Sequence, residues 1–273
     1  MRDAFEGLWG AFPPKSDVDV IPTTAKSVPA AWLADPTARD DRIVIYLHGG
    51  GFKLGSISSH LSITSRLSGA ARSRVLALDY RLMPEHVFPS QIDDTVAAYA
   101  WLLEQGYGPN NLAFAGDSAG GGLALAALLR LRRDGLPLPA CAVAFSPWTD
   151  LLGEGGWRDA DACVPHIDPF ATAPLLDETA RTYLAGADPR DPLASPLYGD
   201  CEGLPPLLIQ VGKQELLLGD STRFAQNARS AGVEVELEIQ DGAFHVWQHA
   251  APEVPEAVAA IGQAGAFIQK HLA

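Results

Sequence analysis

A serine stands between closely spaced glycines in the run GDSAG at residues 116–120, with Ser118 at its centre. An apolar stretch, residues 111–115, precedes the run, and a helix-like stretch, residues 121–133, follows it. A strand that turns directly into a helix at such a serine presents the hydroxyl at the end of a sheet, in the turn called a nucleophile elbow. The glycines permit a turn in which Cβ atoms would collide. A Gly/Ser-rich turn without chemistry could share this composition, but the strand before it and the helix after it favour the elbow.

Strand-like and helix-like segments alternate along the chain from residue 42 onward. Residues 140–145 are apolar throughout, which is typical of a strand buried on both faces. The alternation predicts an α/β fold in which a mostly parallel central sheet is flanked by helices. The expected strands are residues 18–23, 27–33, 42–47, 74–79, 111–115, 140–145, 206–211 and 233–240, and the expected helices are residues 61–72, 90–105, 119–134, 220–231 and 256–272.

Two regions interrupt this alternation. The N-terminal region begins with an amphipathic piece that ends at Pro13 and Pro14. The second region is rich in Pro, Gly and Asp and contains one clear helical pattern, residues 177–184. A long irregular insertion in a compact α/β domain is typically functional and often forms a lid, although a solvated loop is the alternative. The predicted division is residues 1–41 as an N-terminal cap segment with the first strands, 42–148 and 204–273 as the α/β core, and 149–203 as an inserted cap.

Candidate partners for the serine can be sought by their order in the chain. A serine hydroxyl needs a base within hydrogen-bond reach and a third group that orients the base. Sheets of this kind supply them in the order serine, acid, histidine. His245 follows the last expected strand and is favoured over His249, which could share its face of a following helix. Glu215 is the first carboxylate after the strand at 206–211 and is favoured over Asp220, which has the position of a helix N-cap or first-turn acid.

A histidine and three glycines at residues 48–51 directly follow the strand expected at 42–47. Glycines in this position allow backbone N–H groups to turn toward a developing negative charge, and Ala119, the residue after the serine, offers a further N–H group. Each such donor is typically worth about 100- to 1000-fold in rate. A glycine-rich turn could instead hold a phosphate, but the GxGxxG pattern and a Walker lysine are absent. The sequence therefore predicts an oxyanion hole.

Taken together, these motifs resemble the hormone-sensitive-lipase family of bacterial carboxylesterases. The resemblance covers nearly the whole chain from about residue 40 and implies an α/β-hydrolase core with a cap. It also implies hydrolysis of short acyl esters without a cofactor. The segments that carry it are HGGGF at 48–52, DYRLMPEHVFP at 79–89, GDSAGG at 116–121, residues 205–220 and FHVW at 244–247.

The resemblance also implies roles for individual residues. Glu215 stands where many family members have aspartate, and because glutamate is one methylene longer, the loop geometry must compensate. Asp117 is expected to brace the elbow, and the N-terminal segment is short for the family. The implied functional residues are Ser118 as nucleophile, His245 as base, and Gly50, Gly51 and Ala119 as oxyanion donors.

Composition limits the partners and the compartment. The net charge of -13 argues against nucleic acid and against anionic membrane surfaces as partners. Apolar stretches stay well below the roughly 18 residues of a transmembrane helix, and the N-terminus lacks the apolar region of a signal peptide, so a cytoplasmic protein is expected. Cys141, Cys163 and Cys201 are odd in number and show no CxxC spacing, so free thiols are expected, with no metal site.

The substrate pocket should be apolar, and the tentative candidates are large side chains near the predicted site. Each of them could equally serve core packing. The candidates are Phe52, Trp148, Leu217, Val246 and Trp247, with Ile167 and Phe170 from the inserted cap.

The expected function is therefore that of a serine carboxylesterase for short- to medium-chain acyl esters, with a small-molecule ester as substrate. The same machinery could open a lactone or remove an acetyl group, since these reactions share a tetrahedral intermediate. A non-catalytic small-molecule receptor on this fold is disfavoured, because Ser118 and His245 are both present. The resemblance suggests a homodimer joined through the strand at 233–240; an acid-protected edge of a monomer is the alternative.

Overall fold

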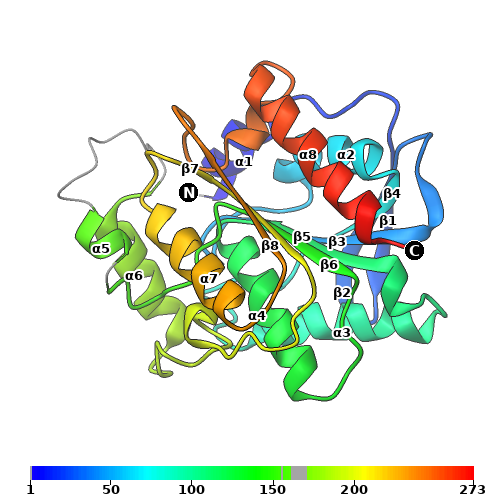
Figure 1. The fold of residues 1–273 in the computed structure, drawn as a ribbon. Coiled ribbons are helices and arrows are strands. Elements are labelled where there is room, and N and C mark those ends of the chain that lie inside the picture. The colour runs from blue at the N-terminus through cyan, green and yellow to red at the C-terminus, as the bar shows by residue number, and fades with distance from the viewer. Residues whose placement is uncertain (1, 155, 161–170) are drawn as a thin grey trace.

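In the part of the chain that the structure describes, eight strands form one sheet in the order β1-β2-β4-β3-β5-β6-β7-β8. The computed structural model describes residues 2–154, 156–160 and 171–273. The pairs β1–β2 and β2–β4 are antiparallel, and all other neighbours are parallel, which confirms the predicted α/β sheet (Figure 1). The strands are β1 Asp19–Ala25, β2 Val28–Ala34, β3 Arg39–Leu47, β4 Ser73–Leu78, β5 Leu112–Asp117, β6 Cys141–Phe145, β7 Leu207–Gly212 and β8 Val235–Gln240.

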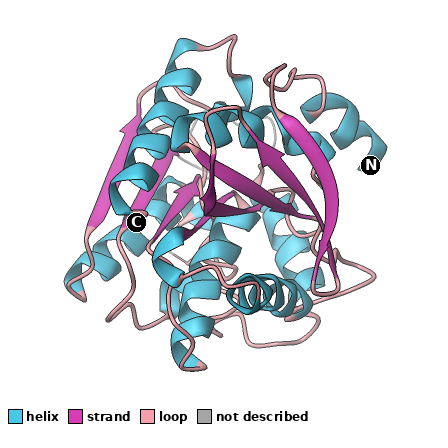
Figure 2. Cartoon of the chain, turned by 90° about the vertical axis from the view of Figure 1, so that its right-hand side faces the viewer, coloured by secondary structure: helices cyan, strands magenta, loops and turns pink. Residues whose placement is uncertain are grey.

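Helices cover both faces of the twisted sheet (Figures 1 and 2). Side chains of a strand alternate between faces, and on β3 Ile45 packs with the cluster of α3, α4 and α7, while Val44 packs with that of α2 and α8. Helix α5 was not expected, and α6 begins earlier than its predicted start at residue 177. The helices are α1 Arg2–Trp9, α2 Leu61–Ala71, α3 Ser90–Glu104, α4 Ala119–Arg133, α5 Trp157–Ala160, α6 Ala173–Leu184, α7 Leu218–Ser230 and α8 Pro255–His271.

Strand β8, whose residues alternate between apolar and acidic, lies at the edge of the sheet. Among the described residues, β7 is the one strand that pairs with it. Its residues are half-buried or exposed, and Ile239 is 46% exposed. The residues of β5, in contrast, are buried throughout. Burial on both faces therefore follows the central, continuous apolar strands, as expected for a parallel sheet covered by helices.

Segments from the N-terminus and from the insertion lie over the carboxyl ends of the strands. Helix α1 is held there by Arg2, whose guanidinium donates to the carbonyls of Lys53 and Met83 and forms an ion pair with Glu85. Helix α6 of the insertion contributes Thr179 to the same cavity that α1 lines. The division of the chain into a core and a cap stays a prediction.

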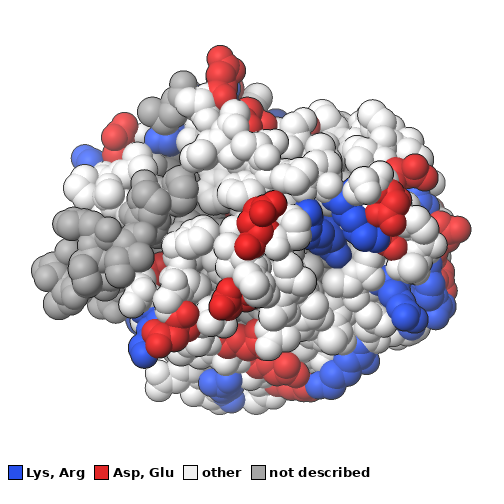
Figure 3. Space-filling model, turned by 90° about the horizontal axis from the view of Figure 1, so that it is seen from above, with Lys and Arg blue, Asp and Glu red and all other residues white. Residues whose placement is uncertain are grey.

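Charged side chains of both signs are interspersed on the face seen from above (Figure 3). No helix of the described residues has the length and the apolar character needed to cross a bilayer. Cys141 and Cys201 are buried free thiols, and burial raises the pKa of Cys141 to about 12. Cys163 lies outside the described residues.

The close approach of the elbow helix to β3 makes Gly120 hard to replace. A Cβ atom at Gly120 would overlap the carbonyls of Leu47 and His48, whereas one at Gly262, in the exposed middle of α8, would meet nothing within 4 Å. Gly120→Ala is therefore expected to lower the free energy of unfolding by about 3 kcal/mol through overpacking. Gly262→Ala, the matched control, should raise it by about 0.5–1 kcal/mol. Urea unfolding measures both, and equal effects would contradict this account.

Candidate active site

The elbow predicted around Ser118 forms where β5 passes directly into α4. Ser118 has φ 53° and ψ -121°, a left-handed conformation that is costly for a residue with a side chain. Backbone hydrogen bonds hold this conformation: the Ser118 N–H donates to Phe145 at 2.8 Å, and its carbonyl accepts from Gly122 and Trp148, each at 3.0 Å. The strained backbone is thus clamped between β6 and α4, with the hydroxyl in the cavity at the end of the sheet.

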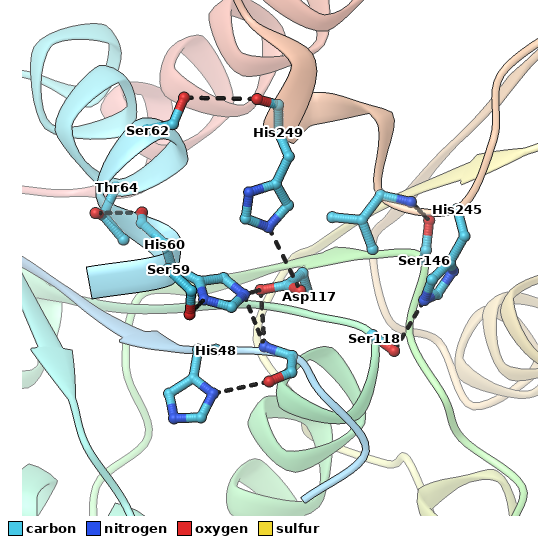
Figure 4. A network of polar contacts seen from close by, with 12 residues as sticks. His48, Ser59, His60, Ser62, Thr64, Asp117, Ser118, Ser146, His245 and His249 are labelled. Carbon is cyan, nitrogen blue, oxygen red and sulfur yellow. Dashed lines mark hydrogen bonds and ion pairs between the residues drawn. The ribbon is translucent and has the colours of Figure 1, made fainter. Parts of the chain in front are cut away.

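His245 and Glu215 come together at this serine. The His245 ring nitrogen Nε2 lies 2.9 Å from the Ser118 hydroxyl (Figure 4), and Nδ1 lies 2.6 Å from Oε2 of Glu215. Both side chains are almost completely buried. A carboxylate at Nδ1 selects the tautomer whose Nε2 can accept the serine proton. The structure therefore brings together the three residues that the chain order predicted, from the loops after β5, β7 and β8.

The competing acid, Asp220, has a different position. Its Oδ2 accepts hydrogen bonds from the backbone N–H groups of Thr149 and Asp150, each at 2.9 Å. It lies in the first turn of α7, as expected, and burial raises its pKa well above the usual range. Asp220 thus anchors the start of the insertion.

The loop after β3 supplies glycines in conformations with positive φ beside the serine. Gly50 has φ 108° and Gly51 has φ 62°, and both line the cavity together with Ser118. Among the described residues, none of the turn, loop and cap hydrogen bonds uses the N–H of Gly50, Gly51 or Ala119 as its donor. Behind the loop, His48 stacks on Tyr80 with ring centroids 4.3 Å apart. Burial lowers the pKa of His48 to about 3, so its ring is neutral at pH 7.

A cavity of about 140 Å³ opens at these groups. Its polar lining includes Ser118 and the side chains close to it, and its apolar lining comes from α1, from α6 and from the loops after β3, β6 and β8. The apolar lining residues are Phe5, Trp9, Leu54, Trp148, Ala171, Leu175, Leu176 and Val246.

Comparison with known proteins identifies the family. A family model described as alpha/beta hydrolase fold matches residues 44–249. The chain is an α/β-hydrolase. An esterase from the bacterial hormone-sensitive lipase family has a similar crystal structure, with a TM-score of 0.96 and 46% identity over 100% of this chain and 91% of that one. A structure of EstE5 soaked with p-nitrophenyl butyrate has a TM-score of 0.94 and 42% identity over 99% and 90% of the two chains.

Among curated proteins, an acetyl-hydrolase of Streptomyces hygroscopicus is 47% identical over 273 residues, which are 98% of this chain and 86% of that protein. This α/β-hydrolase is thus similar in sequence to an acetyl-hydrolase and similar in structure to esterases. It is a carboxylic ester hydrolase of the hormone-sensitive-lipase family.

Three of the residues that were expected to line the substrate pocket do not line the cavity of this hydrolase. Trp148 and Val246 line the cavity, but Phe52, Leu217 and Trp247 are buried outside its lining. Phe52 stacks on Tyr183 of α6 at 3.9 Å between ring centroids, Leu217 is buried where α7 begins, and Trp247 packs with the core on the α8 side. The pattern of apolar residues in the sequence does not show whether each of these side chains points into the cavity or into the core. Ile167 and Phe170 lie outside the described residues.

Two aromatic residues that were not expected in the pocket line the cavity. Phe5 and Trp9 of α1 line the cavity, and the Trp9 ring lies 4.5 Å from the ring of His249. Their amphipathic spacing was visible, but their partner surface was not. Asp117 was expected to brace the elbow. Its carboxylate accepts hydrogen bonds from the Tyr46 hydroxyl at 2.7 Å and from the Gly49 N–H at 3.1 Å, which join the elbow to the glycine loop.

Two histidines complete the surroundings of Asp117. Burial alone would raise the pKa of Asp117, but His60 and His249 beside it hold that pKa well below the usual range. Burial lowers the pKa of His249 to about 4, so this ring is neutral at pH 7. The elbow therefore rests on an ionised, buried carboxylate.

Ser146 is a further residue that the motif analysis overlooked. It follows β6 directly, and its hydroxyl donates to Oε1 of Glu215 at 2.8 Å and accepts from the Val246 N–H at 3.2 Å. The Gly212 N–H is a second donor to Oε1. Ser146 thus ties the acid to the loop that carries His245. Its place at the carboxyl end of a central strand was the signal that could have found it.

Ser146→Ala is expected to lower kcat about 10- to 100-fold, because a hydrogen bond to a charged group contributes about 1.5–3 kcal/mol. KM should change little, since Ser146 holds the acid and is not among the residues that line the cavity. Steady-state kinetics on one ester separate the two constants. Ser146→Cys, which keeps a weak donor without a branch at Cβ, should restore part of the loss, since residue 146 is buried and has φ 45°. An unchanged kcat in the alanine variant would contradict a positioning role.

Proposed function

We propose that this hydrolase is a serine carboxylesterase for short- to medium-chain acyl esters that acts through Ser118, His245 and Glu215. The observation that carries the proposal is the continuous hydrogen-bond path from the serine hydroxyl through the imidazole to the carboxylate, which opens into an apolar cavity. A serine paired in this way with a base and an orienting acid is an activated nucleophile.

In the proposed reaction, Oγ of Ser118 bonds to the ester carbonyl carbon while its proton moves to Nε2 of His245. The carbonyl electrons form an oxyanion that the N–H groups of Gly50, Gly51 and Ala119 stabilise. When the oxyanion collapses, the alcohol leaves with the proton of His245, and the acyl group stays on Oγ. A water molecule then gives a proton to His245, attacks the acyl carbon, and releases the acid as the proton returns to Oγ.

The size of the cavity favours small acyl groups. Its volume of about 140 Å³ is below the roughly 300–1,000 Å³ of pockets for drug-sized ligands. Each methylene that fits contributes about 0.8 kcal/mol of burial. Turnover should therefore rise with chain length while the acyl chain still fits and fall when it exceeds the cavity.

A series of p-nitrophenyl esters from acetate to octanoate tests this function. We expect kcat/KM to peak within the series and to fall at octanoate. Activity on none of these esters would contradict the proposal and favour a receptor. The acetyl-hydrolase relative favours deacetylation as the second candidate, so acetylated amines and a set of lactones of increasing ring size belong in the same panel.

Two expectations about the context stay proposals as well. A homodimer joined through β8 is supported by the open edge of that strand and by the exposure of Ile239. Light scattering that gives the mass of a single 29.0 kDa chain would contradict it. A cytoplasmic location is the second expectation, and fractionation of cells that express the gene tests it.

A further inference from the structure

A cluster of three potential metal ligands lies beside the catalytic cavity. His60 ends a short 3₁₀ turn before α2, Asp117 ends β5, and His249 lies in a 3₁₀ turn after β8. All three line the same cavity as Ser118 (Figure 4). Their side chains are only 2–4% exposed. The cluster is thus shielded from bulk water but borders the space that substrate enters.

The spacing of the three groups matches a metal site. Nε2 of His60 lies 3.4 Å from Oδ1 of Asp117, Nε2 of His249 lies 3.9 Å from Oδ2, and one ligand atom from each residue lies within 4.8 Å of the others. Ligands about 2.0–2.1 Å from a tetrahedral zinc ion are about 3.3–3.4 Å apart. Closing the site would require pairs of these atoms to approach by up to about 1.5 Å.

The hydrogen bonds of His60 orient it as a metal-binding histidine would be oriented. Its Nδ1 lies 3.2 Å from the carbonyl oxygen of Ser56 and 3.0 Å from the Ser59 hydroxyl, and the Gly49 N–H lies 3.2 Å from Nε2. In the tautomer that carries its proton on Nδ1, the Nε2 lone pair is on the side of the Asp117 carboxylate and could bind a metal ion. Metal-binding histidines almost always donate their other N–H to a carbonyl or a carboxylate in this way.

The two oxygens of the Asp117 carboxylate have different neighbours. Oδ1 of Asp117 already accepts from Tyr46 and Gly49, whereas Oδ2 faces His249. Nδ1 of His249 has no hydrogen-bond partner among the described residues. A cation bound between this buried carboxylate and the two ring nitrogens would be stabilised by the carboxylate's negative charge.

We propose that His60, Asp117 and His249 bind one divalent transition-metal ion of the zinc class, with its fourth coordination position open to the substrate cavity. Two imidazoles and one carboxylate are a donor set that zinc accepts, and sites with three protein ligands keep such an open position. Local sequence patterns do not indicate this site, because its ligands come from three distant segments without a metal-binding spacing. The rival occupant is a single proton held between His60 and Asp117.

Binding of Zn²⁺ and Co²⁺ to the full chain, prepared without a polyhistidine tag and stripped with a chelator, tests the proposal. Calorimetry should give one Zn²⁺ per chain. Bound Co²⁺ should show the visible absorption bands of four-coordinate cobalt, and Zn²⁺ should raise the thermal midpoint, as any ligand of the native state does. These readouts use the unmodified chain and do not depend on ester hydrolysis.

Variants of the cluster histidines and of two control histidines test where the ion binds. His60→Gln and His249→Gln should each weaken Zn²⁺ binding about 100-fold or more, because removal even of supporting groups costs about 10- to 100-fold. The exposed His86→Gln and the triad variant His245→Gln should bind as the unmodified chain does. Thermal midpoints without metal show whether each variant folds. Absence of binding at micromolar Zn²⁺ would leave the proton as occupant and overturn the proposal, as would loss of binding in His245→Gln or its retention in both cluster variants.

Discussion

Ser118→Ala is expected to lower kcat for p-nitrophenyl butyrate hydrolysis by about 10⁴-fold or more. Without Oγ there is no atom to carry the acyl group, and His245 loses the partner that lies 2.9 Å from its Nε2. What remains is the contribution of the oxyanion donors and of substrate binding. Burst and steady-state kinetics measure both the loss and the missing acyl-enzyme.

The fold should tolerate this change, because the clamp around residue 118 uses backbone atoms only. Ser230→Ala, at an exposed serine in the last turn of α7, is the matched control and should keep full activity. The thermal midpoints of both variants show whether they fold. Ester turnover that persists in folded Ser118→Ala would end the assignment of the nucleophile.

Glu215→Gln is expected to lower kcat about 10³- to 10⁴-fold, comparable to loss of the orienting acid in other serine hydrolases. The carboxylate accepts a hydrogen bond from the Nδ1–H group of His245, with 2.6 Å between Nδ1 and Oε2. An amide can turn its N–H toward Nδ1, which moves the imidazole proton to Nε2, and Nε2 can then no longer accept the serine proton. Binding should change little, so the loss should lie in kcat.

Two further carboxyl variants test whether Glu215 or Asp220 is the orienting acid. Glu215→Asp keeps the charge but is one methylene shorter, so we expect a loss of about 10- to 100-fold from the weakened hydrogen bond. Asp220→Asn should leave kcat nearly unchanged, because Asp220 binds the start of the insertion and an amide oxygen can still accept there. If Asp220→Asn were the variant that lost activity, the acid would have been misassigned.

Much of the architecture was readable from local patterns. The apolar runs predicted eight strands to within a few residues, and the GDSAG run predicted the turn from β5 into α4. Chain order alone singled out His245 and Glu215, because the loops after successive parallel strands meet at one edge of the sheet. The prediction of the fold is confirmed, because backbone conformation depends mainly on short stretches of sequence; the roles of His245 and Glu215 stay a proposal.

The immediate surroundings of the site were much less readable. Phe52 was expected in the pocket but stacks on Tyr183, whereas Trp9, from the first helix, lines the cavity. Ser146 joins Glu215 to the loop of His245 without any motif of its own.

The sequence by itself determined the order of strands and helices, the strained turn at Ser118 and the three loops from which the proposed triad comes. Only the tertiary structure decided which side chains meet there, including the union of His60, Asp117 and His249. The physical reason is that a strand or a tight turn depends on neighbours in the chain, whereas the direction of a side chain depends on how elements far apart in sequence pack together.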